Sequence, residues 1–215
     1  MAEYNIEVKI RVPGWVEWMV VWPVMVYRKV KYGYVFRRIR LTRGLWAIVD
    51  PEWYERLSEY KWHAKGGHGE CYAARGYRKN GRTAVEWMHK VIMAAALRQC
   101  SGQGIFVVDH INRNTLDNRR ANLRIATIGQ NAMNSKRRGL KAGSSKYKGV
   151  SWDGRAKKWR AMIHVHGRPM YLGGFDDEVE AAKAYDGAAR IYHREFAVLN
   201  FPDNQPQSSQ RTQRK

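Results

Sequence analysis

Four polar residues in the middle of the sequence have the types and order that phosphodiester hydrolysis requires. Asp109 and His110 follow the apolar residues IFVV, Asn122 closes a polar stretch, and Asn131 comes after a second apolar run. A neutral histidine is a suitable general base near pH 7. An Asp carboxylate and an Asn carbonyl oxygen form a hard-ligand pair typical of Mg²⁺, and a divalent ion supplies the Lewis acid. The pattern therefore suggests a metal-dependent hydrolytic site with sparse protein ligation.

The elements expected to position these side chains are a strand, a polar loop, a second strand and a helix. The first strand ends at Asp109 and His110, and the loop ends near Asn122. Thr127-Ile128-Gly129-Gln130 is a capping box, which predicts that a helix begins there and carries Asn131 and Asn134. This order of elements brings the four polar side chains to one point.

The run VVDHINRNTLDNRRANLRIATIGQNAMN resembles the HNH homing endonucleases of phage introns and related free-standing phage nucleases. The match covers the Asp-His pair, the LDNRRANLR stretch and the helix with its Gln-Asn. The resemblance implies that Asp109 and Asn131 hold one Mg²⁺ or Mn²⁺ ion and that His110 is the general base. It also implies that Asn122 orients the imidazole, and that the products carry 5′-phosphate and 3′-hydroxyl ends.

Other interpretations of these polar residues remain open. An Asp-His pair at a strand end is also compatible with a turn and a surface histidine, and Asn-rich loops are often Asx-turns. Asp117 and Asn118 are expected to structure the loop, and Asn134 is either a substitute ligand or a solvated helix residue. His89 either contacts the scissile phosphate or has a structural or capping role. Cys71, His63 and His68 have no matching set of metal ligands nearby, so we expect them to be structural or exposed.

The first half of the chain is expected to be mainly strands and tight turns. Residues 1–37 are rich in Val, Trp and Tyr, which favours one or two strands. Asp50-Pro51 predicts an N-cap and the first position of a short helix through Leu57. Lys79-Asn80-Gly81 predicts a hairpin, because Asn-Gly tolerates the positive φ of a type I′ turn. A helix is expected from about His89 to Leu97.

Residues 146–202 are expected to form three strands and a helix. KKWRAMIHV alternates, so Trp159, Ala161, Ile163 and Val165 should face one side. The helix should begin at Asp176-Asp177, and its predicted apolar stripe consists of Ala181, Tyr185, Ala188 and Tyr192. Basic residues on the other face of a narrow antiparallel sheet suit insertion into a DNA major groove.

Five sequence segments of this region resemble the ethylene-response-factor (Apetala-two) DNA-binding domain across nearly its full length: YKGVSW, KWRA, YLGGF, EAAKAYDGAA and FAVLNFP. By position, the DNA-contacting residues of that family fall on Lys148, Ser151, Asp153, Met162, His164, Pro169 and Tyr171. Several of these are Arg or Trp in the plant proteins, so the plant target sequence does not carry over. The residues of this module that we expect to face DNA are Lys148, Arg160, His164, Arg168 and Tyr171.

The charge balance indicates a polyanionic partner. The 215 residues contain 39 Lys+Arg against 19 Asp+Glu, a formal net charge of +20, with nucleic acid as the first candidate. The most apolar stretch, Trp15 to Tyr27, contains Glu17 and Pro23 and is too short to span a membrane. Two cysteines provide neither a disulfide framework nor a four-cysteine zinc site. Outside the C-terminal module, the cations expected at DNA phosphates are Arg119, Arg120, Arg124, Lys136, Arg137 and Arg138.

These observations predict an α+β protein with a central ββα-metal nuclease fold and a C-terminal sheet-and-helix DNA-binding domain. The expected divisions are an N-terminal extension (1–37), a nuclease domain (38–138, core motif 88–135), a basic linker (139–145), the DNA-binding domain (146–202) and a disordered tail (203–215). The expected partner is double-stranded DNA, with no membrane and no small-molecule cofactor; monomer and homodimer stay open.

The expected function is a homing-type or phage mobile-element endonuclease acting in the cytoplasm of a bacterial or phage-infected cell. The alternative from another class is a sequence-specific DNA-binding regulator with a vestigial nuclease fold. A third is an RNA-binding or assembly protein that uses the aromatic N-terminus.

Overall fold

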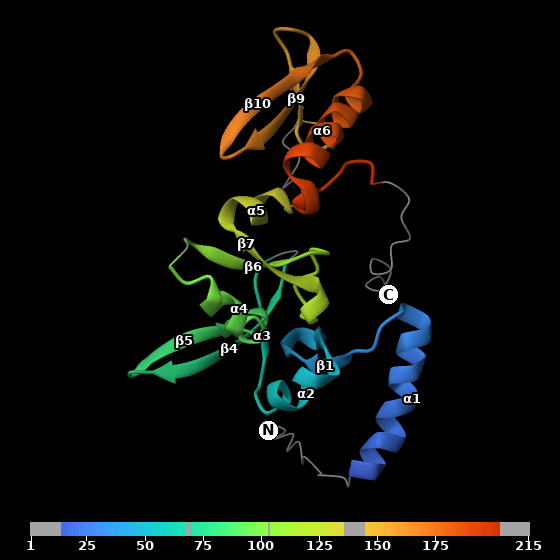
Figure 1. Ribbon diagram of the computed structural model, residues 1–215, viewed down its shortest axis with the longest axis vertical. Helices are drawn as coiled ribbons and strands as arrows, with labels where there is room; N and C mark the ends of the chain where they lie inside the picture. The colour runs from blue at the N-terminus through green and yellow to red at the C-terminus, as the bar shows by residue number, and fades with distance from the viewer. Residues whose placement is uncertain (1–13, 68–69, 103, 136–144, 203–215) are drawn as a thin grey trace, which may run out of the picture.

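The computed structural model describes residues 14–67, 70–102, 104–135 and 145–202 as a chain of small sheets and helices (Figure 1). The predicted disordered tail and the predicted linker, apart from Ser145, lie outside these ranges. The mixed α+β class is confirmed: four small antiparallel sheets of two or three strands alternate with short helices.

The opening segment differs from its prediction. Residues 14–32 form a helix, α1 (Gly14–Tyr32), with Pro23 inside it, rather than a strand, and residues 1–13 of the predicted strand region lie outside the described residues. The many Val, Trp and Tyr residues favour strands, but a strand needs a neighbour for its backbone groups, whereas a helix satisfies them internally. Among the described residues no helix is long and apolar enough to cross a membrane.

Two small sheets follow α1. The strands β1 (Arg37–Arg40) and β2 (Trp46–Val49) pair with each other, and α2 (Pro51–Ser58) confirms the helix predicted after Asp50. The second sheet consists of β3 (His63–Lys65), β4 (Tyr72–Lys79) and β5 (Arg82–Trp87). Asn80 (φ 49°) and Gly81 (φ 74°) form the predicted hairpin turn. The predicted following helix is interrupted at Met93, which separates α3 (Met88–Ile92) from α4 (Ala94–Gln99).

The central strand-loop-strand-helix order is as predicted. The strands β6 (Phe106–His110) and β7 (Leu123–Thr127) are antiparallel, with Asp109 opposite Arg124. The short helix α5 (Ile128–Met133) begins with the complete capping box of Thr127 and Gln130. One apolar cluster, which includes Leu57, Trp62, Met88 and Leu123, joins the elements from β1 to β7. The central strands are therefore anchored by a core made largely of the preceding residues.

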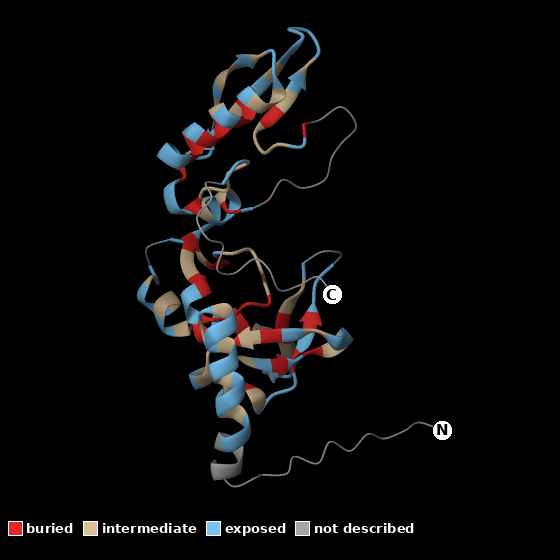
Figure 2. Ribbon diagram, turned by 90° about the vertical axis from the view of Figure 1, so that its right-hand side faces the viewer, coloured by how far each residue is buried: buried red, intermediate tan, exposed pale blue. Residues whose placement is uncertain are grey.

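The C-terminal residues form the predicted three-stranded sheet and helix. The sheet has the order β10 (Arg168–Phe175), β9 (Lys158–Val165), β8 (Val150–Asp153), and α6 (Glu178–Tyr192) packs on it. The predicted alternation along β9 is confirmed by the burial of Ala161 and Ile163. Tyr192 is 46% exposed, so its placement in the apolar stripe was wrong; Ala182 and Ala189 are buried instead. In Figure 2 the buried residues gather where α6 faces the strands.

The C-terminal module meets the rest of the chain at β7 and α5. Arg124 Nη1 donates to the backbone oxygen of Glu195 (2.7 Å), and the guanidinium lies 3.7 Å from the centroid of the Phe196 ring. On the other side, Lys148 Nζ donates to the backbone oxygens of Met133 (2.5 Å) and Ser135 (2.8 Å). These contacts attach the C-terminal module directly to β7 and to the end of α5.

Candidate active site

The predicted catalytic residues gather around one small polar hollow. Its volume is about 110 Å³, and its walls come from the end of β6, the loop after it and the end of α5. The residues around it are Glu70, Tyr72, Val108, Asp109, His110, Arg113, Thr115, Asn131, Asn134 and Ser135. Three of the four residues singled out by their types, Asp109, His110 and Asn131, therefore border the same space.

Asp109 is held in place by two side chains. It is 4% exposed, and Arg124 Nε donates to its Oδ2 (2.8 Å). Asn134 Nδ2 donates to Oδ1 (2.8 Å), to Oδ2 (3.0 Å) and to the backbone oxygen of His110 (2.9 Å). Asn134 is 6% exposed, so its interpretation as a solvated helix residue was wrong. Asn131 is exposed at the rim of the hollow.

His110 is buried and faces Asn118. Its Nε2 lies 3.4 Å from Asn118 Oδ1, and the same amide donates through Nδ2 to the backbone oxygen of Leu116 (3.2 Å). An amide oxygen only accepts, so the tautomer that makes this contact carries its proton on Nε2 and leaves Nδ1 as the basic nitrogen. Burial lowers the pKa of His110, although Asn118 and the nearby carboxylates of Asp109 and Asp117 oppose the shift. The imidazole is therefore neutral near pH 7, which a general base requires.

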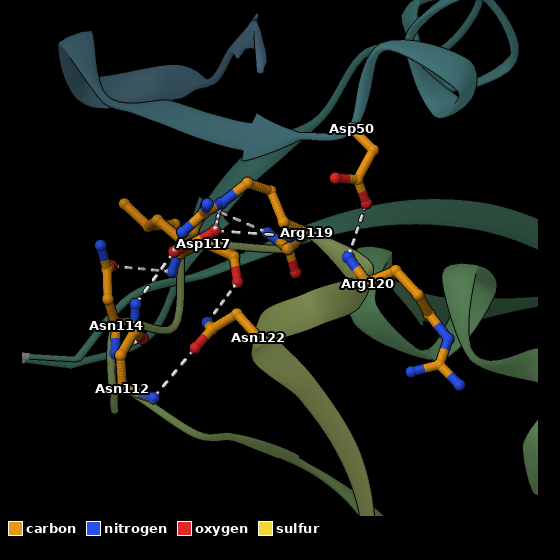
Figure 3. Close-up of polar contacts among 9 residues, drawn as sticks. Asp50, Asn112, Asn114, Asp117, Arg119, Arg120 and Asn122 are labelled. Atoms are coloured by element: carbon orange, nitrogen blue, oxygen red, sulfur yellow. Dashed lines mark hydrogen bonds and ion pairs between the residues drawn. The ribbon is translucent and has the colours of Figure 1, made fainter. Parts of the chain in front are cut away.

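Asn122 does not make the predicted contact with the imidazole. Its Oδ1 accepts from the backbone nitrogen of Asn112 (2.9 Å), and its Nδ2 donates to the backbone oxygen of Asp117 (2.7 Å) (Figure 3). The side chain thus fixes the two ends of the loop, while Asn118 is the residue beside His110. The sequence contains an Asn at both positions and no signal that distinguishes them.

His89 lies behind His110 in an aromatic cluster. The two imidazole centroids are 5.1 Å apart, and the rings of Tyr72 and Trp87 also contact His89. Burial, reinforced by the neighbouring charges of His110 and Lys90, lowers the pKa of His89 to about 3. His89 is 6% exposed and does not border the hollow, so this geometry favours the structural alternative.

Of the three arginines of this region that were expected at phosphates, two make internal contacts. Arg119 is 7% exposed and donates through Nε (2.7 Å) and Nη2 (2.6 Å) to the buried carboxylate of Asp117 (Figure 3). Arg124 binds Asp109 and the backbone of Glu195, as described above. Arg120 is exposed, and its Nη1 donates to the backbone oxygen of Leu123 (3.3 Å). Lys136, Arg137 and Arg138 lie outside the described residues.

Lys148 does not face outward as predicted. Its ammonium is directed at the carbonyl oxygens that follow α5, and burial, with the charge of Arg113, lowers its pKa to about 8. A C-terminal helix end attracts a cation, because its last carbonyl groups have no partner within the helix. The sequence could not show this contact, because Lys148 and Met133 belong to different elements.

Most of the other residues that were expected to face DNA lie on the outer face of the C-terminal sheet. Cross-strand register places Ser151 opposite Arg160, Tyr171 opposite Met162 and Pro169 opposite His164, and directly opposed residues share a face. Tyr171 is 62% exposed. Arg168 is opposite Val165, whose side chain packs toward α6, so Arg168 belongs to the other face.

The residues at the hollow fit a hard divalent cation. They provide a buried carboxylate on Asp109 and an amide oxygen on Asn131, and Mg²⁺ sites often use only one or two carboxylates together with water and substrate phosphate. The described residues contain no group of three or more His, Cys, Asp or Glu side chains that could hold a metal ion.

Arg113 was missed in the sequence. It lies between His110 and Asn122 in the polar loop and borders the hollow, with its Nε buried and without a hydrogen-bond partner. Sequence alone gives every arginine in NRNTLDNRRANLR the same weight.

Comparisons with known proteins agree with these observations. Residues 101–133 match the family model for HNH endonucleases. An HNH endonuclease of Acanthamoeba polyphaga mimivirus is 28% identical over 159 residues, which cover 74% of this chain and 76% of the viral protein. APETALA2-like protein 2 of Oryza sativa subsp. indica and an AP2-like ethylene-responsive transcription factor of Arabidopsis thaliana are each 43% identical over 65 residues, 30% of this chain. The matched stretch spans only 15% and 13% of those plant proteins. The chain thus combines an HNH endonuclease motif, which supports a nuclease, with a segment similar to plant AP2-type DNA-binding proteins.

Proposed function

We propose that the protein is a metal-dependent DNA endonuclease that hydrolyses phosphodiester bonds with His110 as general base. The observation that carries the proposal is the position of Asp109 and His110. They are consecutive, both buried, and both at the wall of one polar hollow within the segment that matches HNH endonucleases. A neutral imidazole beside a carboxylate fits water activation next to a metal ion.

In this proposal Asp109 and Asn131 hold the divalent ion, Mg²⁺ or Mn²⁺. When bound, the ion supplies Lewis-acid stabilisation of the charge that develops on the phosphate and on the leaving 3′ oxygen. Asn134 and Arg124 keep the Asp109 carboxylate in one orientation through their hydrogen bonds. Both are positioning residues, since they act through Asp109.

His110 is oriented for its role by the contact with Asn118. With the proton on Nε2, the Nδ1 lone pair accepts a proton from water as the water attacks phosphorus. The loop that carries Asn118 is fixed by Asn122 and by the Asp117–Arg119 pair, so the imidazole and its partner keep their relative positions. Fixed positioning of a base lowers the entropic cost of reaching the transition state.

We further propose that residues 146–202 are a DNA-binding domain that brings duplex DNA to residues 38–138. The C-terminal sheet, α6 and α5 border a common hollow of about 600 Å³, lined by Met162, His164 and Tyr185 of the C-terminal module and by Gly129 and Met133 of α5. Asn131, on the same helix, borders the candidate active site. DNA held on Arg160, His164 and Tyr171 would therefore pass beside α5. A homing or phage mobile-element role would fit this combination of nuclease and reader.

The test is nicking of supercoiled plasmid DNA with Mg²⁺ by the wild type, His110→Ala and the control His63→Ala. His63 is an exposed histidine on β3, outside the hollow. We expect cleavage by the wild type and the control, and a loss of about 10²–10⁴-fold in His110→Ala, the usual contribution of a general base. Undiminished nicking by His110→Ala would overturn the role of this residue. Sequence-specific binding without any cleavage would favour the regulator with a vestigial nuclease fold.

A further inference from the structure

The loop between β6 and β7 directs one arginine into the hollow that contains the candidate metal ligands. Arg113 borders this space together with Asp109, His110 and Asn131. It is half-buried, whereas Arg120 in the same loop is exposed. The position of Arg113 is therefore a property of the site and not of the general basic surface.

The backbone at Arg113 is held in a conformation that arginine rarely adopts. Its φ is 62°, in the left-handed region, which is unfavourable for a residue with a Cβ. The turn is closed by the Arg113 backbone nitrogen, which donates to His110 oxygen (2.8 Å). The neighbouring Asn112 donates through Nδ2 to Asp117 (2.9 Å) and accepts from the backbone nitrogen of Asn114 (2.8 Å). Gly or Asn would suit this turn better, so the turn itself does not explain an arginine.

The guanidinium of Arg113 lacks the internal partner that the neighbouring buried arginines have. Arg119 is paired with Asp117 and Arg124 with Asp109, but within the described ranges no carboxylate forms an ion pair with Arg113. Its Nε is buried without an acceptor, and burial lowers its pKa. Burial of a cation without a partner is unfavourable. An anionic ligand in the hollow would offset it by accepting from the remaining donors of the half-buried guanidinium.

We infer that Arg113 is a phosphate-binding residue of the candidate active site, which takes a non-bridging oxygen of the phosphodiester that the site cleaves. This inference rests on the proposed endonuclease function and names the group that receives the substrate there. The planar guanidinium presents its donors in a fork that matches phosphate geometry, and it neutralises charge that grows in the transition state. Arg113 would thus hold the phosphate in the same hollow in which Asp109 and Asn131 would hold the metal ion.

The test compares Arg113→Asn, Arg113→Lys and the matched control Arg43→Asn. Asn tolerates the left-handed conformation, so the first variant removes the charge and keeps the turn. Arg43 has the same φ of 62°, is exposed, and lies in the β1–β2 connection outside the hollow, so its substitution makes the same change of charge and backbone elsewhere. Two quantities are measured: the rate of plasmid nicking with Mg²⁺, and the salt dependence of duplex DNA binding in EDTA.

We expect Arg113→Asn to lower the nicking rate by about 10²–10³-fold, the cost of removing one donor that stabilises transition-state charge. Its plot of log K against log salt concentration should lose about 0.9 of slope, the contribution of one phosphate contact. Arg113→Lys should keep the slope and recover part of the rate, and Arg43→Asn should nick at the wild-type rate.

Wild-type nicking and an unchanged slope in Arg113→Asn would overturn the inference and leave the proposed function intact. If the wild type does not cleave DNA, the proposed function fails, and the binding slope still decides whether Arg113 contacts phosphate. If Arg113→Asn does not fold, Arg113→Gly is measured in its place, because it removes the same charge and glycine tolerates the left-handed φ. An unchanged slope and an unchanged nicking rate in that variant contradict the assignment.

Discussion

Removal of the Arg119 guanidinium should destabilise the protein without weakening its contacts with DNA phosphates. The side chains of Arg119 and Asp117 are only 9% and 3% exposed, and two short hydrogen bonds of 2.7 and 2.6 Å join them. The guanidinium also lies 3.5 Å from the centroid of the Tyr34 ring. In Arg119→Ala the Asp117 carboxylate stays buried with Asn112 Nδ2 as its remaining side-chain donor. Loss of one partner of a buried pair costs about 3–5 kcal/mol.

The assay is urea unfolding of Arg119→Ala beside Arg120→Ala, a neighbouring exposed arginine. The first variant should lose about 3–5 kcal/mol, which corresponds to a decrease in Tm of about 6 °C or more at roughly 2–4 °C per kcal/mol. The second should stay within about 0.5 kcal/mol of the wild type. The DNA-binding slope should be unchanged in Arg119→Ala. Unaltered stability together with a lower slope would show that Arg119 serves DNA and would refute the assignment of an internal pair.

Three further outcomes are expected. The pKa of His89 is lowered to about 3, so between about pH 3 and 6.5 the unfolded chain binds a proton that the folded chain does not, and the free energy of unfolding rises with pH across this window. Unfolding at a series of pH values should show a smaller slope of the free energy against pH in His89→Phe than in the wild type. An equal slope would contradict the lowered pKa. Lys148 should titrate near pH 8 in a ¹³Cε NMR titration, and a value near 10.5 would show that its ammonium is solvated. Gly149→Ala places a Cβ 2.0 Å from the Tyr185 ring and should destabilise the C-terminal module by several kcal/mol in thermal unfolding. Gly167→Ala has a similar φ and no atom within 4 Å of the added Cβ, so it should cost only about 1–2 kcal/mol. Equal losses in the two variants would contradict the close packing of Gly149 against Tyr185.

Local signals in the sequence were sufficient for most of the secondary structure after residue 37. Asn80-Gly81, the capping box at Thr127 and the alternation along KKWRAMIHV each involve residues close together in the chain, and each prediction is confirmed. The opening segment is the exception. The β propensity of its Val and aromatic residues depends on pairing with another strand, and residues 14–32 form the helix α1, which satisfies its backbone internally.

The sequence by itself also determined which residue types could do chemistry, because Asp109, His110, Asn122 and Asn131 stand in a recognisable order. Only the tertiary structure decided how the polar groups pair: Asn118, not Asn122, lies beside His110, and Asn134 binds Asp109. The same holds for the cations. Arginines have the same charge in the sequence, but a buried carboxylate occupies Arg119 and Arg124, whereas Arg113 faces the hollow without one. Hydrogen bonds form between groups that the fold brings within about 3 Å, and that distance is set by packing between elements rather than by spacing along the chain.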